Sequence, residues 1–164
     1  MGLDMYAFSL DRSAAFATPR DVLKYRAPTL GKDLPEGFLV LDGPSPAYNL
    51  GAEFLGSKYV LPGSALLQQW RKHPALHGWM ERYWRSMQWH KGGKKKFNKN
   101  ERVPLDAQAL DALEHAVRHG LLPKTDGFFF GESEGTEHAK DPAFIAAARA
   151  ALAAGKFVYY TSWW

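Results

Sequence analysis

The sequence predicts an α+β fold, with a small, mainly antiparallel sheet packed against about three helices. Short alternating or apolar segments at both ends of the chain are typical of strands, and segments with helical spacing or helix-capping residues lie between them. The chain has 164 residues, of which 46% are hydrophobic and 23% charged. This length and composition predict a single globular domain, 1–164.

The first predicted strand covers residues 3–10, LDMYAFSL. Its alternation places Leu3, Met5 and Ala7 on one face and Tyr6 and Phe8 on the other. Two more short strands are predicted over 37–41 and 58–61, separated by a stretch rich in Gly, Pro, Ser and Asn that we expect to loop over the surface.

A helix is predicted to begin at Ser64, because apolar and aromatic residues recur at helical spacing as far as Met87. Pro74 is unfavourable inside a helix. Either the helix kinks there, or two helices meet and the second begins with Pro74.

The second half of the chain predicts two helices and two strands. One helix covers 105–119 and ends at Gly120 as C-cap, and a strand follows over 128–130. The other helix begins with Asp141 as N-cap and Pro142 in the first position and ends at Gly155, and the last residues, 156–164, form a strand.

Charge is concentrated in one segment. The chain carries a net charge of +4, and residues 91–102 alone hold five Lys and one Arg against one Glu. Phosphate contacts by the lysines of this segment, with base stacking on Phe97 and Trp89, suit nucleic acid or a nucleotide. A solvated loop is the alternative that we favour. The lysines concerned are Lys94, Lys95, Lys96 and Lys99.

The sequence also limits the class of protein. It contains no cysteine, which excludes disulfides and zinc–thiolate sites. The N-terminal residues lack the features of a signal peptide, and no run approaches the roughly 18 apolar residues of a membrane span. We therefore expect a cytoplasmic protein without membrane contact.

Two pairs of histidines have the i, i+4 spacing of metal-binding helices, His73/His77 and His115/His119. Spacing fixes no third ligand for either pair, so no metal or other cofactor is expected. We expect His115/His119 in a solvated last helical turn. For His73/His77 we favour buried, hydrogen-bonded side chains. His77 and Glu132, which lies in the acidic segment 132–140, are weak catalytic candidates.

Aromatic residues suggest a binding groove. Two adjacent Tyr and two adjacent Trp lie near the C-terminus, and the members of each pair point to opposite faces of the last predicted strand. Exposed Trp and Tyr are typical interface anchors. The predicted ligand-binding side chains are Trp70, Arg71, His77, Trp79, Tyr160 and Trp163.

Four motifs carry a resemblance: MGLDMY at the N-terminus, the WRK and LHxW elements within 69–80, LLPKTDGFFFG at 121–131 and the C-terminal YYTSWW. In this order they resemble a family of small, uncharacterised proteins encoded mostly by phages and prophages. The resemblance implies an accessory protein in the cytoplasm of an infected or lysogenic bacterial host.

Three functions follow in order of preference. The first is a non-enzymatic binding protein that contacts a host protein through an aromatic groove. The second is a binder of nucleic acid or a small nucleotide that uses the basic segment 91–102 and Arg71. The third is a small hydrolase or phosphate-handling enzyme centred on His77.

Overall fold

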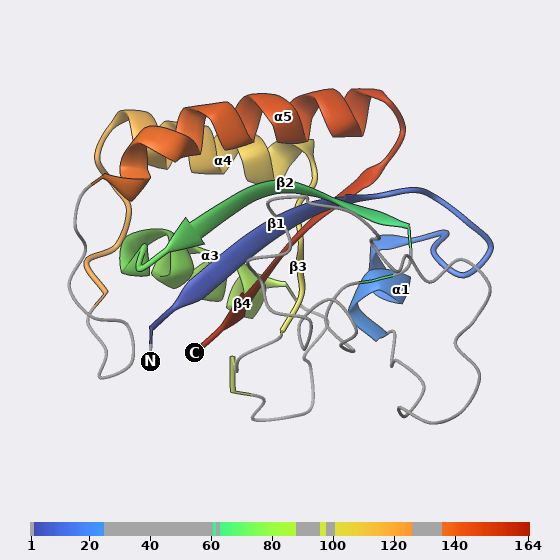
Figure 1. The fold of residues 1–164 in the computed structure, drawn as a ribbon, viewed down its shortest axis with the longest axis horizontal. Coiled ribbons are helices and arrows are strands. Elements are labelled where there is room, and N and C mark those ends of the chain that lie inside the picture. Colours follow the sequence, from blue (N-terminus) through green and yellow to red (C-terminus); the bar gives the residue numbers. More distant parts are fainter. Residues whose placement is uncertain (1, 25–60, 62, 88–95, 98–100, 126–135) are drawn as a thin grey trace, which may run out of the picture.

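The fold is organised around an antiparallel sheet with three helices on one face (Figure 1). The computed structural model describes residues 2–24, 61, 63–87, 96–97, 101–125 and 136–164. In these residues the sheet has four strands in the order β2-β1-β4-β3. The predicted α+β class is confirmed. The strands are β1 Asp4–Leu10, β2 Ser64–Arg71, β3 Val103–Pro104 and β4 Phe157–Trp163.

Strand β1 lies between β2 and β4 and is buried on both faces. Leu3, Met5 and Ala7 pack into one core, which we call the helix-side core, and Tyr6 and Phe8 pack into a second cluster on the opposite face. The predicted division of these side chains is confirmed. Because β1 and β4 are antiparallel neighbours, the two chain ends lie close together (Figure 1).

The prediction of a helix beginning at Ser64 is wrong, because Ser64–Arg71 forms edge strand β2. The pairing with β1 skips Leu67, so that Leu66 packs into the far cluster and Leu67 against the helix-side core. This bulge interrupts the alternation that identifies a strand, and it leaves Leu66 and Trp70 at a spacing that fits a helix.

Helix α3, Pro74–Ser86, begins with Pro74, as in the second alternative, but it follows strand β2 and not another helix. Helix α4, Ala107–Arg118, matches its prediction closely: Asp106 caps the N-terminus, where its carboxylate accepts from the Ala109 amide at 2.7 Å. Gly120, with φ +64°, ends the helix in the left-handed conformation, and the Leu121 amide donates to the Ala116 carbonyl.

Helix α5, Asp141–Ala153, follows a short 3₁₀ helix, η3, Glu137–Lys140. The prediction that Asp141 caps α5 is wrong, because its carboxylate bonds to Trp70 and His73 instead. Helices α3, α4 and α5 supply the helix-side core with side chains such as Leu76, Leu110 and Phe144. The short helix α1, Pro19–Lys24, places Val22 in the far cluster.

Some predictions lie outside the described residues. These are the strand over 37–41, most of that over 58–61 and the strand over 128–130. None of the helices in the described part of the chain has the length and apolar character that a membrane crossing requires.

Candidate metal centre

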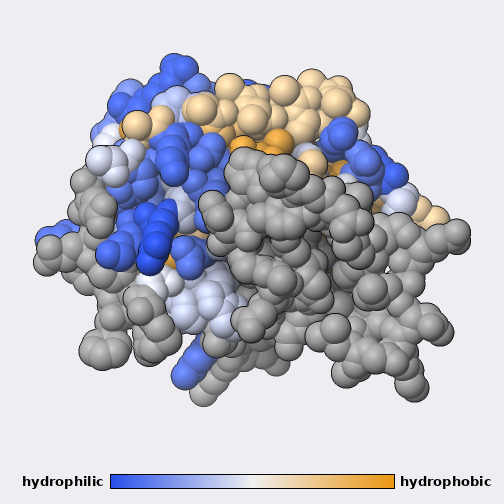
Figure 2. Space-filling model, viewed as in Figure 1, coloured by the Kyte–Doolittle hydropathy of each residue, from blue (hydrophilic) through white to orange (hydrophobic). Residues whose placement is uncertain are grey.

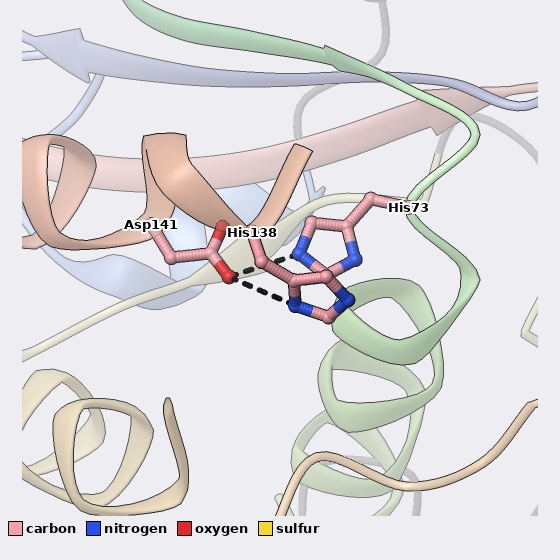
Figure 3. A group of neighbouring side chains, drawn as sticks. All are labelled: His73, His138 and Asp141. Carbon is pink, nitrogen blue, oxygen red and sulfur yellow. Dashed lines mark hydrogen bonds and ion pairs between the residues drawn. The ribbon is translucent and has the colours of Figure 1, made fainter. Parts of the chain in front are cut away.

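Three side chains from two separate parts of the chain meet where β2 ends and α5 begins (Figure 3). His73 lies in the turn between β2 and α3, His138 lies in η3, and Asp141 is the first residue of α5. Their ligand atoms, one per residue, all lie within 4.8 Å of one another. This cluster joins the edge of the sheet to the helical layer.

Local backbone structure places these side chains. Lys72 adopts a left-handed conformation, with φ 55°, and its amide donates to the Leu3 carbonyl at 2.8 Å. The chain thereby reverses direction before Pro74 starts α3, and His73 is left at the N-cap. On the other side, residues three apart in a 3₁₀ helix project in the same direction, so His138 and Asp141 both reach His73.

Asp141 is completely buried, and two N–H groups satisfy its carboxylate. The Trp70 indole donates from Nε1 to Oδ1 at 3.0 Å. His73 Nε2 lies 2.9 Å from Oδ2, and the other ring nitrogen of His73, Nδ1, accepts from the Leu76 amide at 3.4 Å. These partners assign the proton of His73 to Nε2, which therefore donates to the carboxylate. A buried carboxylate requires hydrogen-bond donors such as these two N–H groups.

His138 forms the open side of the cluster. Its side chain is 44% exposed, whereas His73 and Asp141 are both 0% exposed. Its ring packs edge-on against that of His73 with 4.2 Å between centroids. Its Nδ1 lies 3.9 Å from Oδ2 of Asp141, which is too long for a hydrogen bond and leaves room for the ring to move.

One cationic side chain, that of Lys140, lies at this corner. Lys140 is exposed, and its Nζ donates to the Gln69 carbonyl at 3.3 Å, one residue before Trp70. Arg71 ends β2 and, by alternation, points to the opposite face of the sheet from Trp70; the side chains of Arg71 and Lys72 both approach Gly2. Figure 2 shows hydrophilic side chains gathered at the end of the molecule where α5 begins.

The predicted pair His73/His77 does not act together. His77 is buried in the helix-side layer, where its Nδ1 lies 2.7 Å from the Tyr160 hydroxyl and its ring packs on Phe97 and Trp164. Burial lowers the pKa of His77 to about 4, so the side chain is neutral at neutral pH. The buried, hydrogen-bonded state that we favoured is observed for both histidines.

The six predicted ligand-binding side chains are spread over both faces of the sheet. Trp70, His77 and Tyr160 are buried on the helix side. Trp163 is 37% exposed and, by alternation along β4, points to the opposite face from Tyr160. Trp79 is half-buried on α3, and Arg71 is exposed.

Other predicted residues fall into two groups. His115 and His119 are exposed in the last turn of α4, with ring centroids 4.4 Å apart, as expected. Phe97 is buried against Trp84 and is therefore not exposed for base stacking, and Trp89 lies outside the described residues. Lys96 is exposed. Lys94, Lys95, Lys99 and Glu132 lie outside the described residues, and their roles stay predictions.

Sequence reasoning missed His138 and Asp141 as partners of His73. No spacing rule connects residues so far apart in the chain. The available signal was local: a histidine three residues before an Asp-Pro helix start, in the segment EHAKDP. Asp141 and Pro142 in this segment predict a helix start, and by themselves they do not indicate a metal ligand.

No protein-family model, curated protein or solved structure matches the chain.

Proposed function

We propose that the protein binds a divalent transition-metal ion, with zinc as the best fit, through His73, His138 and Asp141. The observation that carries this proposal is the convergence of two imidazoles and a buried carboxylate at one corner of the fold. Imidazole nitrogen and carboxylate oxygen are ligands that zinc prefers, and two histidines with one carboxylate form a known ligand set of catalytic zinc.

The distances suit this ion after a small movement. Two ligand atoms of a tetrahedral zinc ion lie roughly 3.3 Å apart, since each bond is about 2.0 Å long. The separation of His73 Nε2 from Asp141 Oδ2 is 2.9 Å, and that of His138 Nδ1 from the same oxygen is 3.9 Å. Because His138 is half-exposed, its ring can close the longer gap without disturbing the core.

Metal binding requires His73 to change its tautomer. Nε2 donates a proton to Asp141 in the metal-free state and must carry a lone pair to bind metal. The proton then moves to Nδ1, and the contact with the Leu76 amide is lost. The Nδ1–H group then faces the Leu76 N–H, and the hydrogen bond from Nε2 to Asp141 is lost as well, so the metal–ligand bonds must outweigh the loss of both hydrogen bonds. The Trp70 indole continues to hold Oδ1 and to orient the carboxylate.

Calorimetric titration of the purified protein with Zn²⁺ tests the proposal. We expect one site per chain, and we expect His138→Asn to weaken binding by more than about 100-fold, because losing a ligand costs more than losing an outer hydrogen bond. The His138 side chain is exposed, so the variant should fold normally.

His119→Asn is the matched control. It removes an exposed imidazole from the His115/His119 pair, whose ring centroids lie 4.4 Å apart and which is, within the described residues, a second place where two histidines approach each other closely. If His119→Asn abolished zinc binding while His138→Asn preserved it, the ion would belong on α4 and the proposal would be wrong.

A second proposal, that the protein contacts a host protein as a phage accessory factor, is supported by aromatic side chains at the surface. Trp79 stacks on Tyr83 at 5.5 Å and 15°, both half-buried on α3, and Trp163 is exposed at the end of β4. Such side chains are frequent hot spots in interfaces.

This second proposal needs an identified, purified partner. Binding should weaken at least about tenfold in Trp163→Ala. It should be unchanged in Leu121→Ala, which removes the other large exposed hydrophobic side chain in the described residues. Equal effects of the two variants would count against an aromatic contact.

A further inference from the structure

We propose that the metal centre binds a phosphate group from solution at its open face, as inorganic phosphate or as a phosphate monoester. This inference rests on the metal binding proposed above and names the ligand class of that same site. Two properties carry it: the one-sided burial of the three protein ligands, and the charge around them.

The protein ligands leave one side of the ion facing solvent. His73 and Asp141 are completely buried, and His138 is the half-exposed ligand. An ion held by these three atoms therefore lies at the protein boundary, next to His138. Three protein ligands with an exchangeable fourth position are typical of catalytic zinc sites, whereas structural sites are closed by four.

Charge determines which molecule suits that fourth position. A divalent cation bound by one carboxylate keeps an excess positive charge. Lys140 adds to it, because it directly precedes Asp141 and its Nζ donates to the Gln69 carbonyl beside Trp70. Glu137, which is buried and directly precedes His138 in the chain, opposes it. The loaded corner still has a net positive charge and favours a dianionic ligand.

Lys140 is the residue through which this charge is testable. It precedes Asp141 directly, and its ammonium group donates to the Gln69 carbonyl at the edge of β2. This single exposed hydrogen bond holds the ammonium near the corner without neutralising it. The Lys140 charge repels a metal ion and attracts a phosphate. Its removal must therefore affect the two ligands in opposite directions.

The experiment uses Co²⁺ in place of Zn²⁺, because its visible absorption reports changes in its ligands. Inorganic phosphate is titrated into the Co²⁺-loaded full chain at constant ionic strength, and AMP is titrated separately. We expect each phosphate probe to change the absorption, whereas acetate at equal concentration leaves it unchanged. The probe that changes the absorption at the lower concentration shows whether the site prefers inorganic phosphate or a phosphate monoester.

Lys140→Gln should bind Co²⁺ about threefold more tightly and phosphate about threefold more weakly, the size expected for one exposed charge. Lys156→Gln is the matched control, because Lys156 is a half-exposed lysine that follows the C-terminal end of α5, opposite to the end at Asp141, and pairs with Asp11 at 3.0 Å. It should change neither affinity.

The outcomes separate the two proposals. Absence of Co²⁺ absorption in the wild type would contradict metal binding itself. Normal Co²⁺ absorption that no phosphate probe alters would overturn the phosphate inference alone. Gel filtration after the titration establishes whether Co²⁺ stays on the protein; a spectral change caused only by loss of Co²⁺ to the added phosphate would also overturn it.

Discussion

Two buried histidines of α3 and its N-cap show how neighbours of the same type acquire different chemistry. His73 bonds to the carboxyl group of Asp141 and lies beside an exposed histidine. His77 bonds to the neutral hydroxyl of Tyr160 and is surrounded by aromatic rings. Burial raises the pKa of Tyr160 well above its usual range, so that hydroxyl stays protonated and uncharged in its hydrogen bond with His77. His77 therefore supports the core, and His73 belongs to the candidate metal centre.

The pKa of His77 predicts a pH-dependent stability. In the folded protein burial lowers this pKa to about 4, from an unfolded value of about 6.5. Between these values the unfolded chain takes up a proton that the folded protein does not. The free energy of unfolding is therefore unaffected by protonation of His77 above pH 6.5. It decreases as pH falls from 6.5 towards 4, by about 3 kcal/mol in all.

Urea unfolding at several pH values measures this effect. His77→Gln keeps an acceptor for the Tyr160 hydroxyl and has no titrating ring, so its stability should fall less than that of the wild type between pH 6.5 and 4. Parallel pH profiles of the two proteins would show that His77 does not carry the dependence.

At the scale of secondary structure, the sequence identified elements whose signals are local. The alternation of β1 and the capping residues of α4 both act within a few residues, and both predictions are confirmed. Strand β2 was missed because its bulge at Leu67 shifts the face of each following residue. Its pairing with β1 is a long-range contact, and it overrides a helical pattern that has no such partner.

The bond from Trp70 to Asp141 connects β2 to α5, and its removal should weaken the fold. Trp70→Phe keeps an aromatic ring against Phe144 but removes the indole N–H that lies 3.0 Å from Oδ1. We expect a loss of about 2–3 kcal/mol in the free energy of unfolding, because a buried carboxylate loses a donor. Trp79→Phe, at a half-buried position, should cost less than about 1 kcal/mol. Equal losses would indicate ring size as the cause.

Gly78 allows the segment after α4 to approach α3. A Cβ at this position would lie 1.9 Å from Thr125 Oγ1 and 3.0 Å from Thr125 Cβ. Gly78→Ala should therefore destabilise the protein by about 1–3 kcal/mol in urea unfolding. Thr125→Ala removes the nearest of these atoms, so the double variant should recover part of the loss. If the effects of the two substitutions were simply additive, the clash with Thr125 would not be the cause of the lost stability.

At the scale of the whole molecule, the candidate metal centre could not be predicted from the sequence. Its ligands come from the end of an edge strand and the start of the last helix, and only the packing of the helical layer on the sheet brings them together. The sequence indicated His73 as one of a pair of histidines, and it indicated Asp141 only as a helix N-cap. The charge and burial that distinguish the site arise from the tertiary fold.

Because the ligands join two distant parts of the chain, metal binding should stabilise the whole fold. An ion that binds only the folded state adds about 2.7 kcal/mol at a concentration 100 times its Kd. For a domain of this size Tm should rise by roughly 5–10 °C, and EDTA should reverse the rise. His138→Asn should lose this response and His119→Asn should keep it, since only His138 lies with His73 and Asp141. A zinc-dependent rise of equal size in His138→Asn would show that the ion stabilises the fold from another site.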